Sequence, residues 1–184
     1  GGTCPAPEEL LREYQRRLDA VIAQRAGDLQ SGRARADDFV VWGARAFLEK
    51  LRGRGLRLII LSGTIEPRVR EEARLLGLDV FFGRHIYGGT ADPGAFSKKL
   101  VIDRLLAGEA ISGSRLLAFG DGPVEIQETK RAGGRAIGVA SDEENNGSGQ
   151  ADRWKRAQLL QAGADAVVAD YQAAEELLKM ILGS

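Results

Sequence analysis

The sequence predicts a doubly wound α/β fold, in which a parallel sheet carries helices on both faces. Strand-like and helix-like segments alternate from residue 56 to the end of the 184-residue chain, as such folds require. The strand-like segments are short, apolar and partly β-branched, which is typical of parallel strands buried on both faces. Glycine occupies 24 positions, well above its usual share, and indicates many tight loops.

The first half of the chain supplies a helical segment and then the first strand. Residues 8–26 carry apolar side chains every three or four positions, which predicts an amphipathic helix. A polar linker with a glycine follows at residues 27–38, and a helix at 44–52 ends at two glycines. Residues 56–61, LRLIIL, form the first expected strand. A helix at 66–76 and a short strand or turn at 80–82 come next.

The second half repeats the alternation of helix and strand. After a loop at 88–94, helices are expected at residues 96–106, 124–132, 152–161 and 173–182, and strands at 116–119, 135–139 and 166–169. The sequence therefore divides into a helical segment with its linker, residues 1–37, and an α/β core, residues 38–184.

Composition excludes several classes of partner. Lys and Arg together number 26, and so do Asp and Glu, so no chain-wide basic field attracts nucleic acid. No apolar run is long enough to span a membrane, and no signal peptide is recognisable. The single cysteine, Cys4, cannot form an internal disulfide, which suits a reducing compartment. We therefore expect a cytoplasmic protein without nucleic-acid or membrane partners.

Ser62 and Gly63 directly follow the first strand. Ligands of parallel sheets bind at the carboxyl ends of the strands, and a hydroxyl beside a glycine N–H suits a phosphoryl group. The alternative is a strand-ending turn in which Ser62 or Thr64 caps the next helix.

Asp121 follows the strand at 116–119 between two glycines, and Glu125 stands four residues later. A carboxylate at a strand end is a suitable ligand for Mg²⁺, which keeps several waters. Glu125 would then position a water or a lysine. The alternative makes Asp121 a helix N-cap and Glu125 a first-turn residue that the helix dipole favours.

Lys98 and Lys99 stand at the start of the helix at 96–106, where the helix dipole disfavours cations. The apolar residues Val101, Ile102 and Leu105 place Lys98 on the buried face and Lys99 farther outward. The alternative is a pair of solvated lysines. The only histidine, His85, has no metal-binding or triad partners in the sequence, and we interpret it as structural.

Taken together, Ser62-Gly63, Lys98 and GDGPVE at 120–125 resemble the motifs of the haloacid dehalogenase-like superfamily of hydrolases. The likeness covers residues 38–182, through VVWGARAFLEKLRGRGLRLIILSGT, FSKKLVIDRLL and LLAFGDGPVEIQETKRAGGRAIGVASDE. It implies a Rossmann-like core, and residues 8–36 look like the closing helices of an inserted helical cap.

The resemblance implies an Mg²⁺-dependent phosphatase of a small phosphorylated metabolite. Ser62, Lys98 and Asp121 would be catalytic. Ser62, Gly63 and Lys98 would bind phosphate, and Asp121 would bind the metal with Glu125 behind it. The family's nucleophilic aspartate belongs to a D-x-D motif, and no D-x-D precedes residue 38. We therefore expect that the nucleophile and the first strand lie on an upstream segment, and that this chain alone is inactive.

Two other functions fit the same residues. One is a catalytically inactive binding or regulatory module, which the lack of a D-x-D motif favours and the joint presence of Ser62, Lys98 and Asp121 disfavours. The weaker alternative is a dehalogenase or a phosphomutase on the same scaffold. Metal dependence separates the dehalogenases, because those of this superfamily work without a metal and tend to lack an aspartate where Asp121 stands.

Overall fold

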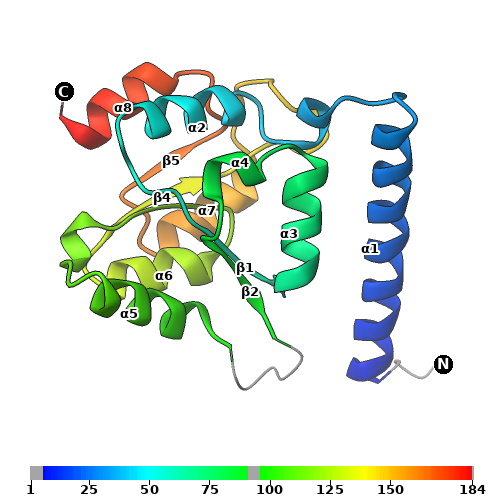
Figure 1. Cartoon of the computed structure of the whole chain (residues 1–184), viewed down its shortest axis with the longest axis horizontal. Coiled ribbons are helices and arrows are strands. Elements are labelled where there is room, and N and C mark those ends of the chain that lie inside the picture. Colours follow the sequence, from blue (N-terminus) through cyan, green and yellow to red (C-terminus); the bar gives the residue numbers. More distant parts are fainter. Residues whose placement is uncertain (1–5, 91–95, 184) are drawn as a thin grey trace. The chain divides into compact units, whose positions relative to one another are not determined.

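The computed structural model describes residues 6–90 and 96–183 (Figure 1). Cys4 and part of the expected loop at 88–94 lie outside these residues. The chain folds as two units, which divide between Phe39 and Val40. The elements in chain order are α1 (Pro7–Gln30), η1 (Ala36–Phe39), α2 (Ala44–Gly53), β1 (Ile60–Ile65), α3 (Glu66–Leu75), α4 (Asp79–Phe82), β2 (Ile86–Gly89), α5 (Lys98–Gly108), η3 (Gly113–Arg115), β3 (Leu117–Gly120), α6 (Pro123–Arg131), β4 (Arg135–Val139), α7 (Arg153–Gln161), β5 (Ala166–Val168) and α8 (Ala174–Leu182).

The first unit consists of α1 and the turns that follow it. The helix continues past Gly27, where the sequence predicted its end, and Ser31 closes it by donating its hydroxyl to the Gly27 carbonyl at 2.7 Å. One glycine inside a helix costs only about 1 kcal/mol, and a long helix tolerates it. The linker predicted at 27–38 is shorter than expected, because α1 extends into its first residues and η1 contains its last residues.

The second unit contains two parallel sheets, β1–β2 and β3–β4–β5. Helices cover both faces of the three-stranded sheet, as the alternation along β4 shows. Ile137 packs in one cluster with Phe47 of α2 and Leu178 of α8, whereas its neighbour Ala136 packs in another with Leu159 of α7. Consecutive strand residues point to opposite faces, so the α/β class predicted from the sequence is confirmed (Figure 1).

The two-stranded sheet differs from the prediction. β1 begins at Ile60 rather than residue 56 and runs through the Ser62-Gly63-Thr64 segment, where the sequence predicted the strand's end. The late start has a simple reason: Ile60 pairs with Ile86, the first residue of β2, and no other strand among the described residues pairs with the chain before Ile60. Residues 80–82, expected as a strand or turn, lie in the short helix α4.

β2 was not predicted, because its sequence IYGG looks like part of a loop. Its glycines allow close approach to the end of β1: a Cβ on Gly88 would stand 2.6 Å from the Thr64 carbonyl oxygen, and one on Gly89 would stand 2.8 Å from that of Gly63. These glycines therefore mark close backbone packing, which a strand pattern based on side chains does not reveal.

Candidate active site

The segment Ser62-Gly63-Thr64 bulges out of the β1–β2 ladder. Leu61 pairs with Tyr87 and Ile65 with Gly89, so four steps along β1 match two along β2. The Ser62 hydroxyl oxygen accepts a hydrogen bond from the Thr64 N–H at 3.1 Å. Neither hydroxyl caps α3, whose N-cap is Ile65, so the capping alternative is wrong. Bulges of this kind re-aim side chains and are frequent beside active sites.

Lys98 and Lys99 differ in environment as their phase on α5 predicted. Ser97 caps the helix by accepting from the Leu100 N–H at 3.2 Å, which sets the direction of its first turn. The Lys98 side chain is 18% exposed and its ammonium lies 2.6 Å from Glu125. Lys99 is 51% exposed and pairs with Asp103 on its own helix. Lys98 is therefore the lysine on the inner side.

Glu125 folds back over the end of β3. Its carboxylate accepts from the Gly122 N–H at 2.9 Å and from Lys98. A Cβ on Gly120 would stand 2.2 Å from Glu125 Cγ, so this packing requires glycine there. Glu125 thus joins the start of α6 to the start of α5: it is the first-turn residue of α6 that the alternative described, and it also holds Lys98.

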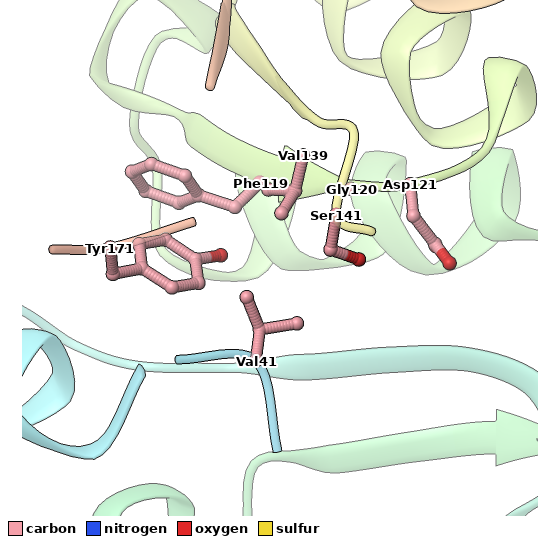
Figure 2. Close-up of a pocket in the computed structure, with 7 residues that line it drawn as sticks. All are labelled: Val41, Phe119, Gly120, Asp121, Val139, Ser141 and Tyr171. Atoms are coloured by element: carbon pink, nitrogen blue, oxygen red, sulfur yellow. The ribbon is translucent and has the colours of Figure 1, made fainter. Parts of the chain in front are cut away.

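Asp121 stands at the end of β3 and is exposed. Gly122, not Asp121, is the N-cap of α6, so the capping alternative for Asp121 is wrong. Within the described part of the chain, no side chain or backbone N–H bonds the Asp121 carboxylate. It lines a pocket of about 210 Å³ together with Val41, Phe119, Gly120, Val139, Ser141 and Tyr171 (Figure 2).

Sequence reasoning missed Ser141 and Tyr171, the other two polar side chains of this pocket. Both follow the carboxyl ends of strands, β4 and β5, so the rule that selected Ser62 and Asp121 could have found them. Burial and, to a smaller extent, the Asp121 carboxylate raise the pKa of the Tyr171 hydroxyl well above its ordinary value. Tyr171 is therefore protonated at neutral pH and available as a donor.

Contacts in the structure join only some of the predicted site residues to one another. Lys98, Glu125 and the glycines around Asp121 form one connected group. Ser62 belongs to the other sheet, and its link to this group is the packing of α5 against both β1 and α6. Among the described residues, no group of three or more His, Cys, Asp or Glu side chains could hold a metal by itself.

Comparison with known proteins assigns the family. Residues 7–133 match the model of the haloacid dehalogenase-like hydrolases, and the chain belongs to this family of hydrolases. No curated protein matches the sequence. No helix in residues 6–90 and 96–183 has the length and apolar character needed to cross a membrane.

Solved structures share the fold at low identity. A conserved haloacid dehalogenase-like protein of unknown function from Agrobacterium tumefaciens aligns with a TM-score of 0.66 at 20% identity, over 97% of this chain and 72% of that one. A family hydrolase from Deinococcus radiodurans with bound phosphate and sodium aligns with a TM-score of 0.62 at 21% identity, over 77% and 59%. A predicted phosphatase from Clostridium acetobutylicum gives 0.60 at 22% identity, over 78% and 60%. The chain thus spans less than two thirds of the length of the last two.

Proposed function

We propose that the chain carries most of the core of an Mg²⁺-dependent phosphatase that acts on a small phosphorylated metabolite. The observation that carries this proposal is the division of the sheet. β1 pairs with β2 and β3 pairs with β4, but β1 and β3 do not pair with each other within the described residues. Both strands leave an edge open, and the candidate residues Ser62 and Asp121 stand at their carboxyl ends.

An open edge of a buried parallel strand is costly, because its N–H and C=O groups need partners. A strand between β1 and β3 would satisfy both edges. We propose that this strand lies on an upstream segment that also supplies the nucleophilic aspartate, in agreement with the lack of any D-x-D before residue 38. Its carboxyl end would then bring the nucleophile between Ser62 and Asp121.

The chain's own residues fit a phosphoryl group. The Ser62 oxygen already accepts from Thr64, so its O–H is free to donate to a phosphoryl oxygen. A Cβ on Gly63 would meet no atom within 4 Å, so a ligand has room beside this residue, where the Gly63 N–H would donate to a phosphoryl oxygen. Lys98, held by Glu125, would neutralise the charge that develops during transfer. These groups bind and orient the phosphoryl group for attack.

Asp121 fits the role of one carboxylate ligand in a magnesium site. It is exposed and has no described hydrogen-bond partner, whereas Glu125 is occupied by Lys98 and Gly122. Mg²⁺ commonly takes one or two carboxylates, water and substrate phosphate, so Asp121 would need the upstream carboxylate beside it. When bound, the ion would polarise the phosphoryl group.

The test compares two proteins: the 184-residue chain, and a form extended by the residues encoded directly upstream. With p-nitrophenyl phosphate and Mg²⁺, we expect background hydrolysis from the first and turnover from the second. Asp121→Asn in the extended form should abolish that turnover, and Asp103→Asn, which changes an exposed carboxylate on α5, serves as the matched control. Mg²⁺-dependent turnover by residues 1–184 alone, lost in Asp121→Asn, would overturn the upstream placement of the nucleophile.

A non-catalytic binding module is the second candidate, and the lack of a D-x-D motif in the sequence favours it. It predicts that the extended form binds inorganic phosphate, that Lys98→Met weakens this binding, and that no phosphate ester is hydrolysed. Turnover in the extended form would exclude it.

A further inference from the structure

We propose that the pocket beside Asp121 is a subsite for the uncharged, hydroxyl-bearing organic part of the phosphate ester, with Tyr171 and Ser141 as its recognition residues. This proposal rests on the proposed phosphatase function and names the substrate's chemistry at the same site.

The lining of this pocket contains three polar side chains. Asp121, Ser141 and Tyr171 all line it, and no described residue makes a hydrogen bond to the carboxylate or to either hydroxyl. Figure 2 shows Tyr171 and Asp121 on opposite sides of the pocket, with Ser141 between them. Ser141 and Tyr171 are only partly exposed, and polar groups in such places normally find partners, so their two unpartnered hydroxyls indicate a place for a ligand.

The Tyr171 ring is fixed, so its hydroxyl has a defined direction. The ring stacks on Phe47 with centroids 4.8 Å apart and meets Phe119 edge to face at 5.9 Å. The backbone is held too, because the Tyr171 N–H donates to the Trp42 carbonyl at 3.0 Å. A hydroxyl on such a rigid support is pre-organised, which lowers the entropy lost on binding.

The size of the pocket limits the ligand. Its volume is about 210 Å³. Drug-sized ligands occupy larger pockets, of about 300 Å³ or more. A fragment of three carbons with its hydroxyls fits this space, with Val41, Phe119 and Val139 available to contact its C–H groups.

Without a bound metal ion, the chemistry of the lining disfavours an anion. Its one charged group is the Asp121 carboxylate, and no lysine or arginine lines it. The Tyr171 hydroxyl donates and the Ser141 hydroxyl donates or accepts, which is the pattern that an uncharged, hydroxyl-bearing group matches. The phosphoryl group would stay at the Asp121 end, near the metal, and the alcohol part would extend toward Tyr171.

The test measures binding by the 184-residue chain, which requires no turnover. The probes are glycerol and inorganic phosphate. The signals are the methyl resonances of Val41 and Val139 after selective ¹³C labelling. Glycerol should shift both signals saturably, and phosphate without Mg²⁺ should leave them unchanged. Tyr171→Phe keeps the aromatic packing and should raise the dissociation constant of glycerol about 2–10-fold, the usual effect of one neutral hydrogen bond.

Tyr87→Phe is the matched control, because its hydroxyl faces His85 at 3.5 Å rather than the pocket, and it should leave glycerol binding unchanged. The proposal is overturned if phosphate shifts the two signals as glycerol does, if Tyr171→Phe binds glycerol as tightly as the parent, or if the upstream residues of the extended form abolish the response to glycerol. Turnover by the extended form without any glycerol response would reject the subsite and leave the phosphatase function standing. Glycerol binding by the extended form without turnover by that form would support the subsite and reject the catalytic role.

Discussion

The two sheets of the core contain strands of the same kind but differ in how well they are buried. The last four residues of β4 are all buried, whereas the last three residues of β1 are exposed. Two packed clusters lie on opposite faces of β3–β4–β5, whereas the buried cluster beside β1–β2 is small and contains Val69, Ala73 and Ile86.

The difference in burial follows from the number of neighbours that each strand has. β4 has a partner strand on each side and helices on each face, so its burial is what a parallel sheet requires. β1 has a partner on one side within the described residues. The exposed end of β1 begins at Gly63, directly after the half-buried Ser62, so the candidate phosphate-binding residues lie where β1 is least supported.

Amide hydrogen exchange should show the largest difference between the sheets. Opening of β4 requires loss of both packed faces, so the amides of residues 136–139 should exchange only through global unfolding, while those of residues 61–65 open locally. We expect exchange at least ~100-fold slower in β4, which corresponds to roughly 2.7 kcal/mol. Equal protection in the two strands would contradict the comparison.

The same contrast should appear in stability. Ile137→Ala in β4 removes a side chain that is 3% exposed and should lower the free energy of unfolding by about 2–5 kcal/mol. Ile60→Ala in β1 makes the same chemical change where the side chain is only partly buried, so about 1–2 kcal/mol is expected. Urea unfolding followed by circular dichroism measures both. A loss at Ile60 as large as that at Ile137 would show that β1 is as well packed as β4.

Sequence reasoning worked best where burial is periodic. The strand at 135–139 was predicted with its observed bounds, because the residues AIGV at 136–139 follow Arg135 and two glycines and precede a polar loop. Residues 56–61 have the same appearance, but strand pairing, not hydrophobicity, decides where β1 starts. The position of β2 depends on its pairing with β1, and a local sequence pattern does not contain that pairing.

The site shows the same limit. The inward position of Lys98 follows from helical phase, which is a local property. The ion pair between Lys98 and Glu125 joins residues 27 positions apart, and the pocket joins Asp121 to Tyr171 across two further strands. Knowledge of strand order would have been needed to place Ser141 and Tyr171 beside Asp121.

A variant of Lys98 tests the connection between the two sheets. α5 packs against β1 and α6 packs against β3, so the pair of Lys98 and Glu125 bridges the two regions. Lys98→Met leaves a carboxylate that is 18% exposed without its cation, and should cost about 1–3 kcal/mol of unfolding free energy. Lys99→Met, which removes an exposed pair on one helix, should cost less than about 0.5 kcal/mol.

Thermal or urea unfolding of both lysine variants distinguishes a bridge from a surface pair. The double variant Lys98→Met/Glu125→Gln should lose less than the sum of the two single variants, since the partners are in contact. Additive losses, or equal losses for Lys98→Met and Lys99→Met, would show that the pair does not connect the sheets.

The smallest expected effect concerns a carboxylate that ties β4 to the segment before β5. Asp165 accepts from the Ala136 N–H at 2.8 Å and from Lys130 at 2.6 Å. Burial raises the pKa of Asp165, but these hydrogen bonds outweigh it and the pKa is lowered overall. Because the folded pKa lies below the unfolded value of about 3.9, this stabilisation is fully present above that value and is lost as the pH falls through the folded pKa.

Asp165→Asn keeps an acceptor for Ala136 but loses the ion pair, whose aspartate is 40% exposed, so the loss at neutral pH should be below about 1 kcal/mol. Urea unfolding of both proteins at a series of pH values should give a difference that is constant from neutral pH down to about 4 and shrinks below it. If the difference in unfolding free energy between the two proteins stays unchanged in acid, Asp165 stabilises the fold through its shape and not through its charge.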